Sequence, residues 1–186
     1  MIKKLRIISL ILILVSLGII IYFESIKKYD VYVQNKIIDD VFSIDIDERS
    51  DDSYLSFDDY LGYISIPKFN IKRLIKNTTD SDILNDGYVG VHELSGDLES
   101  DDLIILAGHN VSNVFHKLHS ISIGDVIYIQ TFNVSREFVV YDTSIVNEHD
   151  FSSLVSNRKN ELLLITCTKH NGERLLVFLK EVLWIF

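Results

Sequence analysis

The sequence predicts an all-β fold: a closed barrel of seven or eight short strands with brief helices, preceded by one N-terminal transmembrane helix. Three observations support this prediction. An uncharged apolar run covers residues 7–23, and from residue 61 the chain divides into short segments with strand patterning. Hydrophobic residues make up 47% and charged residues 24% of the 186, a balance typical of a globular chain.

The N-terminus has the pattern of an uncleaved signal anchor. Residues 1–6 contain two lysines and an arginine, and the apolar run of residues 7–23 is at the lower limit of what spans a bilayer of roughly 30 Å. No small-residue cleavage site follows the run. Basic residues favour the cytoplasmic side, so we expect residues 1–6 to be a cytoplasmic tail and the later residues to be extracellular. Lys27 and Lys28 oppose this orientation without reversing it.

The stretch after the anchor, residues 24–59, is acidic and mixed in pattern. It predicts a helix around residues 31–42, followed by a solvated extracellular linker that lifts the next domain off the membrane. An acidic stretch that folds back over a groove is the alternative. The remaining residues, 60–186, form the predicted folded domain.

Strand patterning begins with LGYISIPKFNIKRLI, where apolar and polar residues alternate and Pro67 marks a turn. Short helices are expected at residues 79–84, 111–120 and 150–156, and residues 85–90 have turn chemistry. Short strands with few helices are typical of a closed barrel. The predicted strands are residues 62–66, 71–75, 103–107, 126–131, 136–142, 144–147, 161–166 and 174–182.

Charge and cysteine content exclude some functions. A net charge of −9 argues against nucleic-acid binding, which requires a basic face. The single cysteine cannot form an internal disulfide. By number alone, such a cysteine is more often a buried small hydrophobe than a reactive thiol.

Position changes the interpretation of this cysteine. Cys167 ends one apolar strand, His109 follows another in LIILAGHN, and Arg174 opens the last strand. An imidazole can take the proton of a thiol and later protonate a leaving amine. A guanidinium can stabilise the oxyanion of an acyl-transfer intermediate. Each residue alone is weak support for catalysis, but together they suffice for acyl transfer from a peptide carbonyl.

In their order and context, these segments resemble the sortase family of Gram-positive cysteine transpeptidases. The family signature Thr-Leu-x-Thr-Cys, followed by Arg on the next strand, is similar to LLITC at residues 163–167 followed by Arg174. The strand ending in Gly-His is matched by LIILAGHN, and GYISIPKFNI and FHKLHSISIGDVIYI extend the resemblance to roughly residues 61–182. Leu163 departs from the signature at its first Thr, where we expect an effect on packing rather than on chemistry.

The resemblance implies a role for each residue. Cys167 attacks the Thr carbonyl of a sorting signal similar to Leu-Pro-x-Thr-Gly, His109 acts as general acid and later base, and Arg174 steadies the oxyanion. An amine on a peptidoglycan precursor then resolves the acyl-enzyme. The implied partners are therefore the sorting-signal peptide, this amine and the cell membrane, which the N-terminal helix spans, with the catalytic domain outside.

Supporting residues are also expected. Thr166, Asn110 and His92 are candidates for the groove, with plain strand, turn or loop roles as alternatives. His116 and His119 are expected on a solvated helix face. No cofactor is expected: Asp97 and Asp101 are weak calcium candidates in an acidic loop whose spacing matches no dedicated calcium loop, so a solvated loop is favoured.

Alternative functions remain open. A membrane-tethered β-barrel binding module with a structural cysteine predicts an inert thiol, and a plain cysteine protease predicts hydrolysis that amines do not stimulate. Among sortases, the anchoring type is favoured over the pilin-polymerising type. No proline precedes Pro67 to form an Asp-Pro-aromatic lid, and residues 182–186 are too short for a second membrane span.

Overall fold

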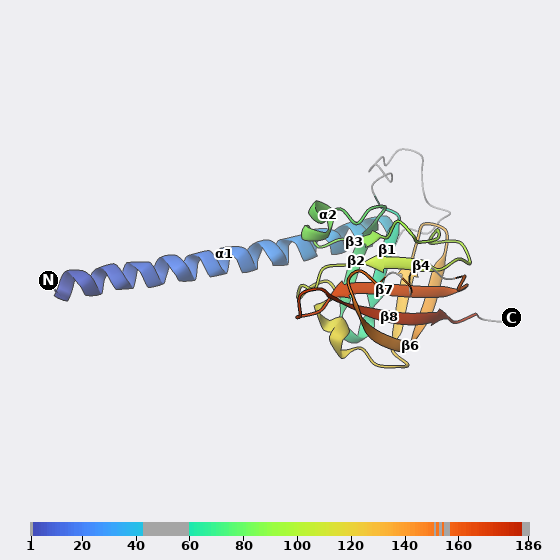
Figure 1. Cartoon of the computed structure of the whole chain (residues 1–186). Helices are drawn as coiled ribbons and strands as arrows, with labels where there is room; N and C mark the ends of the chain where they lie inside the picture. The colour runs from blue at the N-terminus through green and yellow to red at the C-terminus, as the bar shows by residue number, and fades with distance from the viewer. Residues whose placement is uncertain (1, 43–59, 151, 153, 155–156, 184–186) are drawn as a thin grey trace.

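The structure, a computed structural model, describes residues 2–42, 60–150, 152, 154 and 157–183 (Figure 1). It shows one long N-terminal helix that leads to a β-barrel. Residues 43–59 of the linker predicted at residues 24–59, and much of the helix expected at residues 150–156, lie outside the described residues.

The long helix, α1 (Ile2–Phe42), is continuous over 41 residues. Its side chains from Arg6 to Tyr29 are all exposed, and this part is apolar and long enough to cross a membrane. The helix expected around residues 31–42 is therefore formed, as the continuation of the apolar helix.

The last turns of α1 pack on the barrel. Ile38 and Val41 are buried, and so is Gln34, whose amide donates to the carbonyls of Asp86 and Gly87 at 3.3 Å each. The Gln34 Oε1 atom also accepts the main-chain N–H of Leu74 at 3.3 Å. The helix expected at the start of this acidic stretch is thus docked on the folded domain.

The strands form a closed barrel in the order β1-β2-β3-β4-β7-β8-β6-β5, with β5 paired to β1. This arrangement confirms the predicted all-β barrel. The helical segments are η3 (Pro67–Phe69), α2 (Ser81–Asn85) and η4 (His116–Ser120). The strands are β1 (Gly62–Ile66), β2 (Ile71–Lys76), β3 (Val89–Val91), β4 (Ile104–Ala107), β5 (Val126–Gln130), β6 (Ser135–Asn147), β7 (Glu161–Cys167) and β8 (Glu173–Glu181).

Several elements differ from the prediction. The turn expected at residues 85–90 runs into β3, a three-residue strand parallel to β2. The strands expected at residues 136–142 and 144–147 are one strand, β6, with a bulge between Val140 and Asp142. The helix expected at residues 111–120 is helical only in η4, because tight turns occupy its first half.

Side chains alternate between the two faces of the barrel wall, as strand geometry requires. The interior holds a large apolar cluster that includes Ile64, Leu106 and Phe138. A second cluster lies on the outer face of β4, β7 and β8. It consists of Leu103, Ile105, Leu154, Leu163, Ile165, Leu176 and Phe178, and we call it the outer cluster.

Candidate active site

Three strands bring the predicted residues His109, Cys167 and Arg174 to one edge of the barrel. β4 and β7 are parallel, with Ala107 opposite Ile165, so the residues at their carboxyl ends emerge at the same edge. β7 and β8 are antiparallel, and Cys167 is paired directly with Arg174. We call this end of the barrel the catalytic edge.

Alternation places the side chains of Cys167 and Arg174 on the outer face. Cys167 follows Ile165 by two positions, and Arg174 precedes Leu176 by two; Ile165 and Leu176 belong to the outer cluster. An adjoining cavity of about 300 Å³ has an apolar floor and polar walls. It is lined by Thr79, His92, Ala107, Val146, Asn147, Glu148, Asp150, Leu154, Ile165, Arg174 and Leu176. This cavity, which we call the groove, combines apolar residues of the outer cluster with polar and charged side chains.

The loop after β4 is held tightly at His109. The Gly108 N–H donates to the carbonyl of Ile165 at 3.1 Å, and the His109 carbonyl accepts the N–H groups of Val111 at 2.9 Å and Phe115 at 3.1 Å. A Cβ atom on Gly108 would lie 2.6 Å from the buried Phe115 ring. Glycine is therefore required here for close packing of the loop.

Asn110 connects this loop to the cysteine strand. Its Nδ2 donates to the Cys167 carbonyl at 2.8 Å, and its Oδ1 lies 2.8 Å from His116 Nδ1. The same Nδ2 is 3.3 Å from His119 Nε2. Asn110 thus joins the His109 loop to the cysteine strand, and His116 and His119, both exposed as expected, lie close to its side chain.

Arg174 forms an ion pair that the sequence did not indicate. Its Nη2 lies 2.9 Å from Glu148 Oε2, and about one third of each side chain is exposed. Glu148 follows β6, and its N–H donates to the Gly172 carbonyl at 2.8 Å. The carboxylate therefore occupies one of the donor positions of the guanidinium.

The other two supporting candidates, His92 and Thr166, lie on opposite faces of the barrel wall. His92 lines the groove, and its Nδ1 accepts the N–H of Leu94 at 3.2 Å. Thr166 is only 2% exposed and alternates with Cys167, so its side chain faces the barrel interior. Among the residues that the structure describes, its hydroxyl has no hydrogen-bond partner.

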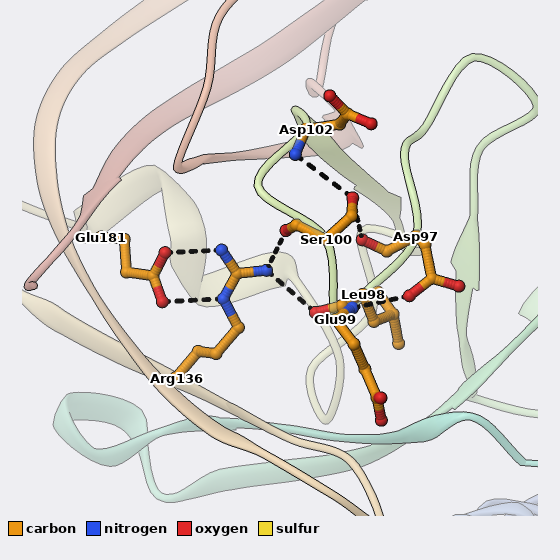
Figure 2. Close-up of polar contacts among 7 residues, drawn as sticks. All are labelled: Asp97, Leu98, Glu99, Ser100, Asp102, Arg136 and Glu181. Carbon is orange, nitrogen blue, oxygen red and sulfur yellow. Dashed lines mark hydrogen bonds and ion pairs between the residues drawn. The ribbon is translucent and has the colours of Figure 1, made fainter.

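The acidic loop between β3 and β4 is held by protein groups (Figure 2). The buried Arg136 guanidinium pairs with Glu181 and donates to the carbonyls of Leu98 at 3.0 Å and Ser100 at 2.6 Å. Asp97 Oδ1 accepts the Glu99 N–H at 2.7 Å. Through Arg136 of β6 and Glu181 of β8, these contacts fix the loop against the barrel wall.

The remaining carboxylates of this loop do not converge on one point. Glu99 accepts hydrogen bonds from Thr131 at 2.6 Å and from Asn133 at 3.0 Å, while Asp101 is exposed. Within the described parts of the chain, no three His, Cys, Asp or Glu side chains are grouped closely enough to hold a metal ion.

A closed barrel with a cysteine, a histidine and an arginine at one edge fits a cysteine acyltransferase, and sequence comparison gives the family. The sequence model of the sortase domain matches residues 64–182, more than half of the chain. The protein therefore belongs to the sortase family, whose members are cysteine transpeptidases. It is 27% identical to Sortase A of Bacillus anthracis over 162 residues, covering 83% of this chain and 76% of that relative.

Solved structures agree with this assignment. Sortase C-1 from Actinomyces oris superposes with a TM-score of 0.62 and 28% identity, over 69% of this chain and 77% of that chain. Sortase C from Clostridium perfringens SM101 superposes with a TM-score of 0.60 and 31% identity, over 68% and 71%. These similarities confirm the predicted family and the predicted sortase-type barrel.

Proposed function

We propose that this protein is a membrane-anchored sortase that cleaves a Leu-Pro-x-Thr-Gly-like sorting signal after Thr and transfers the surface protein to a cell-wall amine. The observation that carries the proposal is the pairing of Cys167 with Arg174 at the edge where His109 emerges. The groove with its apolar floor suits the apolar part of such a signal.

The proposed reaction has two acyl transfers. His109 takes the thiol proton, Cys167 Sγ attacks the Thr carbonyl carbon, and Arg174 stabilises the resulting oxyanion. The C–N bond to Gly breaks as His109 protonates the leaving amine, which leaves a thioester on Cys167. The acceptor amine then attacks the thioester carbonyl, loses its proton to His109 and forms a new amide, and the thiol is regenerated.

The proposed location is the outer side of the cell membrane. Residues 7–23 form the exposed, apolar part of α1, and the cluster of basic residues lies within residues 1–6. Under the positive-inside rule this places the N-terminus in the cytoplasm and the barrel outside, where sorting signals and peptidoglycan precursors meet.

Catalysis is proposed to need no metal ion. The carboxylates of Asp97 and Glu99 have partners within the protein, and a cysteine, a histidine and an arginine supply every proton and charge that the reaction requires. Activity in the presence of a calcium chelator should equal that with added calcium.

Pilin polymerisation is the second candidate. It is favoured by the similarity to two solved sortase C structures at 28% and 31% identity. The choice of acceptor separates the two functions: an anchoring enzyme should use peptidoglycan-type amines, whereas a polymerising enzyme should use the lysine amine of a protein subunit. Both acceptors can be compared in one assay with the same donor peptide.

The test is cleavage of a fluorogenic Leu-Pro-x-Thr-Gly-type peptide. Cys167→Ala should lower turnover at least about 10³-fold, and mass spectrometry of the parent enzyme should detect a thioester on Cys167. Added amine should increase product formation through the new amide. Unchanged turnover in Cys167→Ala, or a thiol inert to alkylation in the folded protein, would reject the proposal in favour of a binding module.

A further inference from the structure

The docked part of α1 begins at the catalytic edge. The Gln34 amide contacts the carbonyls of Asp86 and Gly87. A Cβ atom built on Gly87 would lie 3.8 Å from Val114 and 4.0 Å from Asn113. These two residues belong to the tight loop that follows His109, so Gln34 lies at the end of the barrel where His109 emerges.

The helix ends at the opposite edge. The Phe42 ring stacks on Phe132, with ring centroids 4.7 Å apart. The neighbouring Thr131 donates to Glu99, in the loop that leads into β4. α1 therefore runs antiparallel to β4 and β7, and in Figure 1 the arrowheads of both strands point to the side on which the N-terminal part of α1 extends.

The junction between helix and barrel is built to be stiff. Gln34 is 3%, Ile38 2% and Val41 8% exposed, which is burial typical of a core. No glycine or proline occurs between Phe23 and Phe42, so the helix has no sequence-encoded kink there. The orientation of the barrel relative to the apolar helix is therefore fixed.

The helix also sets the distance between the bilayer and the catalytic edge. From Phe23, the end of the apolar run, to Gln34 is 34 − 23 = 11 residues, which corresponds to about 16 Å of helix at 1.5 Å per residue. The segment between them includes Lys27 and Lys28, whose charges belong outside the hydrocarbon. The catalytic edge is thus separated from the bilayer by roughly three turns of helix.

We propose that α1 is a rigid spacer that holds the catalytic edge facing the bilayer at this height, so that the groove accepts a peptide chain held in the same membrane. This inference rests on the proposed membrane anchoring and transpeptidase activity. An extended peptide rises about 3.3 Å per residue, so about five residues are needed between the bilayer and the scissile bond. Peptides tethered much closer should fail to reach Cys167.

The experiment uses the full chain in lipid vesicles. Donor peptides carry the sorting signal, a proline-rich spacer of varied length and a synthetic transmembrane segment; a soluble peptide with the same signal is the reference. A seven-residue helical insertion between Lys28 and Tyr29 adds about two turns, or about 10 Å, while keeping the docking face in phase. A flexible Gly/Ser insertion of equal length is the matched control.

The helical insertion should lengthen the optimal spacer by about three residues, because a proline-rich chain rises about 3.1 Å per residue. The Gly/Ser insertion should broaden the optimum without a defined shift. Turnover of the soluble peptide should stay within about twofold in all three enzymes, since the catalytic edge is unchanged. An optimum that does not move with the helical insertion, or no dependence on spacer length, would overturn the spacer role. Failure to cleave the soluble peptide would instead reject the proposed function.

Discussion

The side-chain amide of Asn110 donates a 2.8 Å hydrogen bond to the main-chain carbonyl of Cys167. Through this bond, the loop that carries His109 is joined to the strand that carries the cysteine. The Asn110 carbonyl oxygen is in turn held by His116 at 2.8 Å. The distance between the proposed acid and the proposed nucleophile is therefore set partly by a side chain that performs no chemistry itself.

Asn110→Ala should lower kcat about 3- to 10-fold with little change in KM, because one hydrogen bond contributes about 0.5–1.5 kcal/mol and acts on alignment rather than on peptide binding. Asn110→Asp should not restore activity, since a carboxylate cannot donate to the Cys167 carbonyl. Steady-state kinetics and the alkylation rate of Cys167 measure both effects. Asn85→Ala, at an exposed position, is the control; a change in KM alone would contradict the positioning role.

Glu148→Gln should raise kcat/KM a few-fold at low salt, because the neutral amide no longer competes with the oxyanion for the Arg174 guanidinium. The stability of the fold should change by less than about 1 kcal/mol, as expected for a partly exposed ion pair. Assays at low and high ionic strength check this prediction, with the exposed Glu93→Gln as the matched control. A lower kcat/KM would show that the ion pair instead orients Arg174 for catalysis.

Arg136→Met should destabilise the fold by about 3–5 kcal/mol. The substitution leaves Glu181, 12% exposed, without its cation and leaves the Leu98 and Ser100 carbonyls without a donor. Urea unfolding followed by circular dichroism measures the free energy of unfolding. Arg158→Met removes the more exposed cation that pairs with Glu161, so it should lower the free energy of unfolding much less. An equal loss in the two variants would contradict the role of Arg136 in holding the loop.

Gly108→Ala should impair both stability and catalysis, because the new methyl group would press on the buried ring of Phe115. The main-chain N–H of Phe115 donates to the His109 carbonyl, so a shift of Phe115 would move His109. We expect a cost of about 1–3 kcal/mol from overpacking. Gly62→Ala is the control, because its methyl group would clash with the Gln130 carbonyl, far from the catalytic edge. It should lower stability but not the turnover of the folded fraction. Equal turnover in the two folded variants would argue against a role of Gly108 in placing His109.

Much of the catalytic edge could be predicted because its signals are local. Cys167 and His109 each end a short apolar run, and such runs indicate buried strands without knowledge of their partners. β3 was missed because its three residues are held by pairing to β2 and by packing of Gly90 on the Thr78 backbone. Neither interaction leaves a periodic pattern in the sequence.

Contacts between distant segments explain the remaining differences. Glu148 meets Arg174 because β6 pairs with β8 as far as Asn147, the residue before Glu148. The partners of Gln34 lie 40 to 53 residues further along the chain. A polar residue on a mixed helix face looks solvated in the sequence, and only the folded barrel shows that it is buried.

Closure of the sheet has a consequence for how a peptide can be bound. Because β5 pairs with β1, each of the described strands β1 to β8 has a neighbouring strand on both sides. An extended polypeptide arriving at the groove cannot add itself to the sheet as another strand. Recognition must therefore depend on side chains and loops, so a change of target sequence can evolve at the groove without altering the scaffold that supports Cys167.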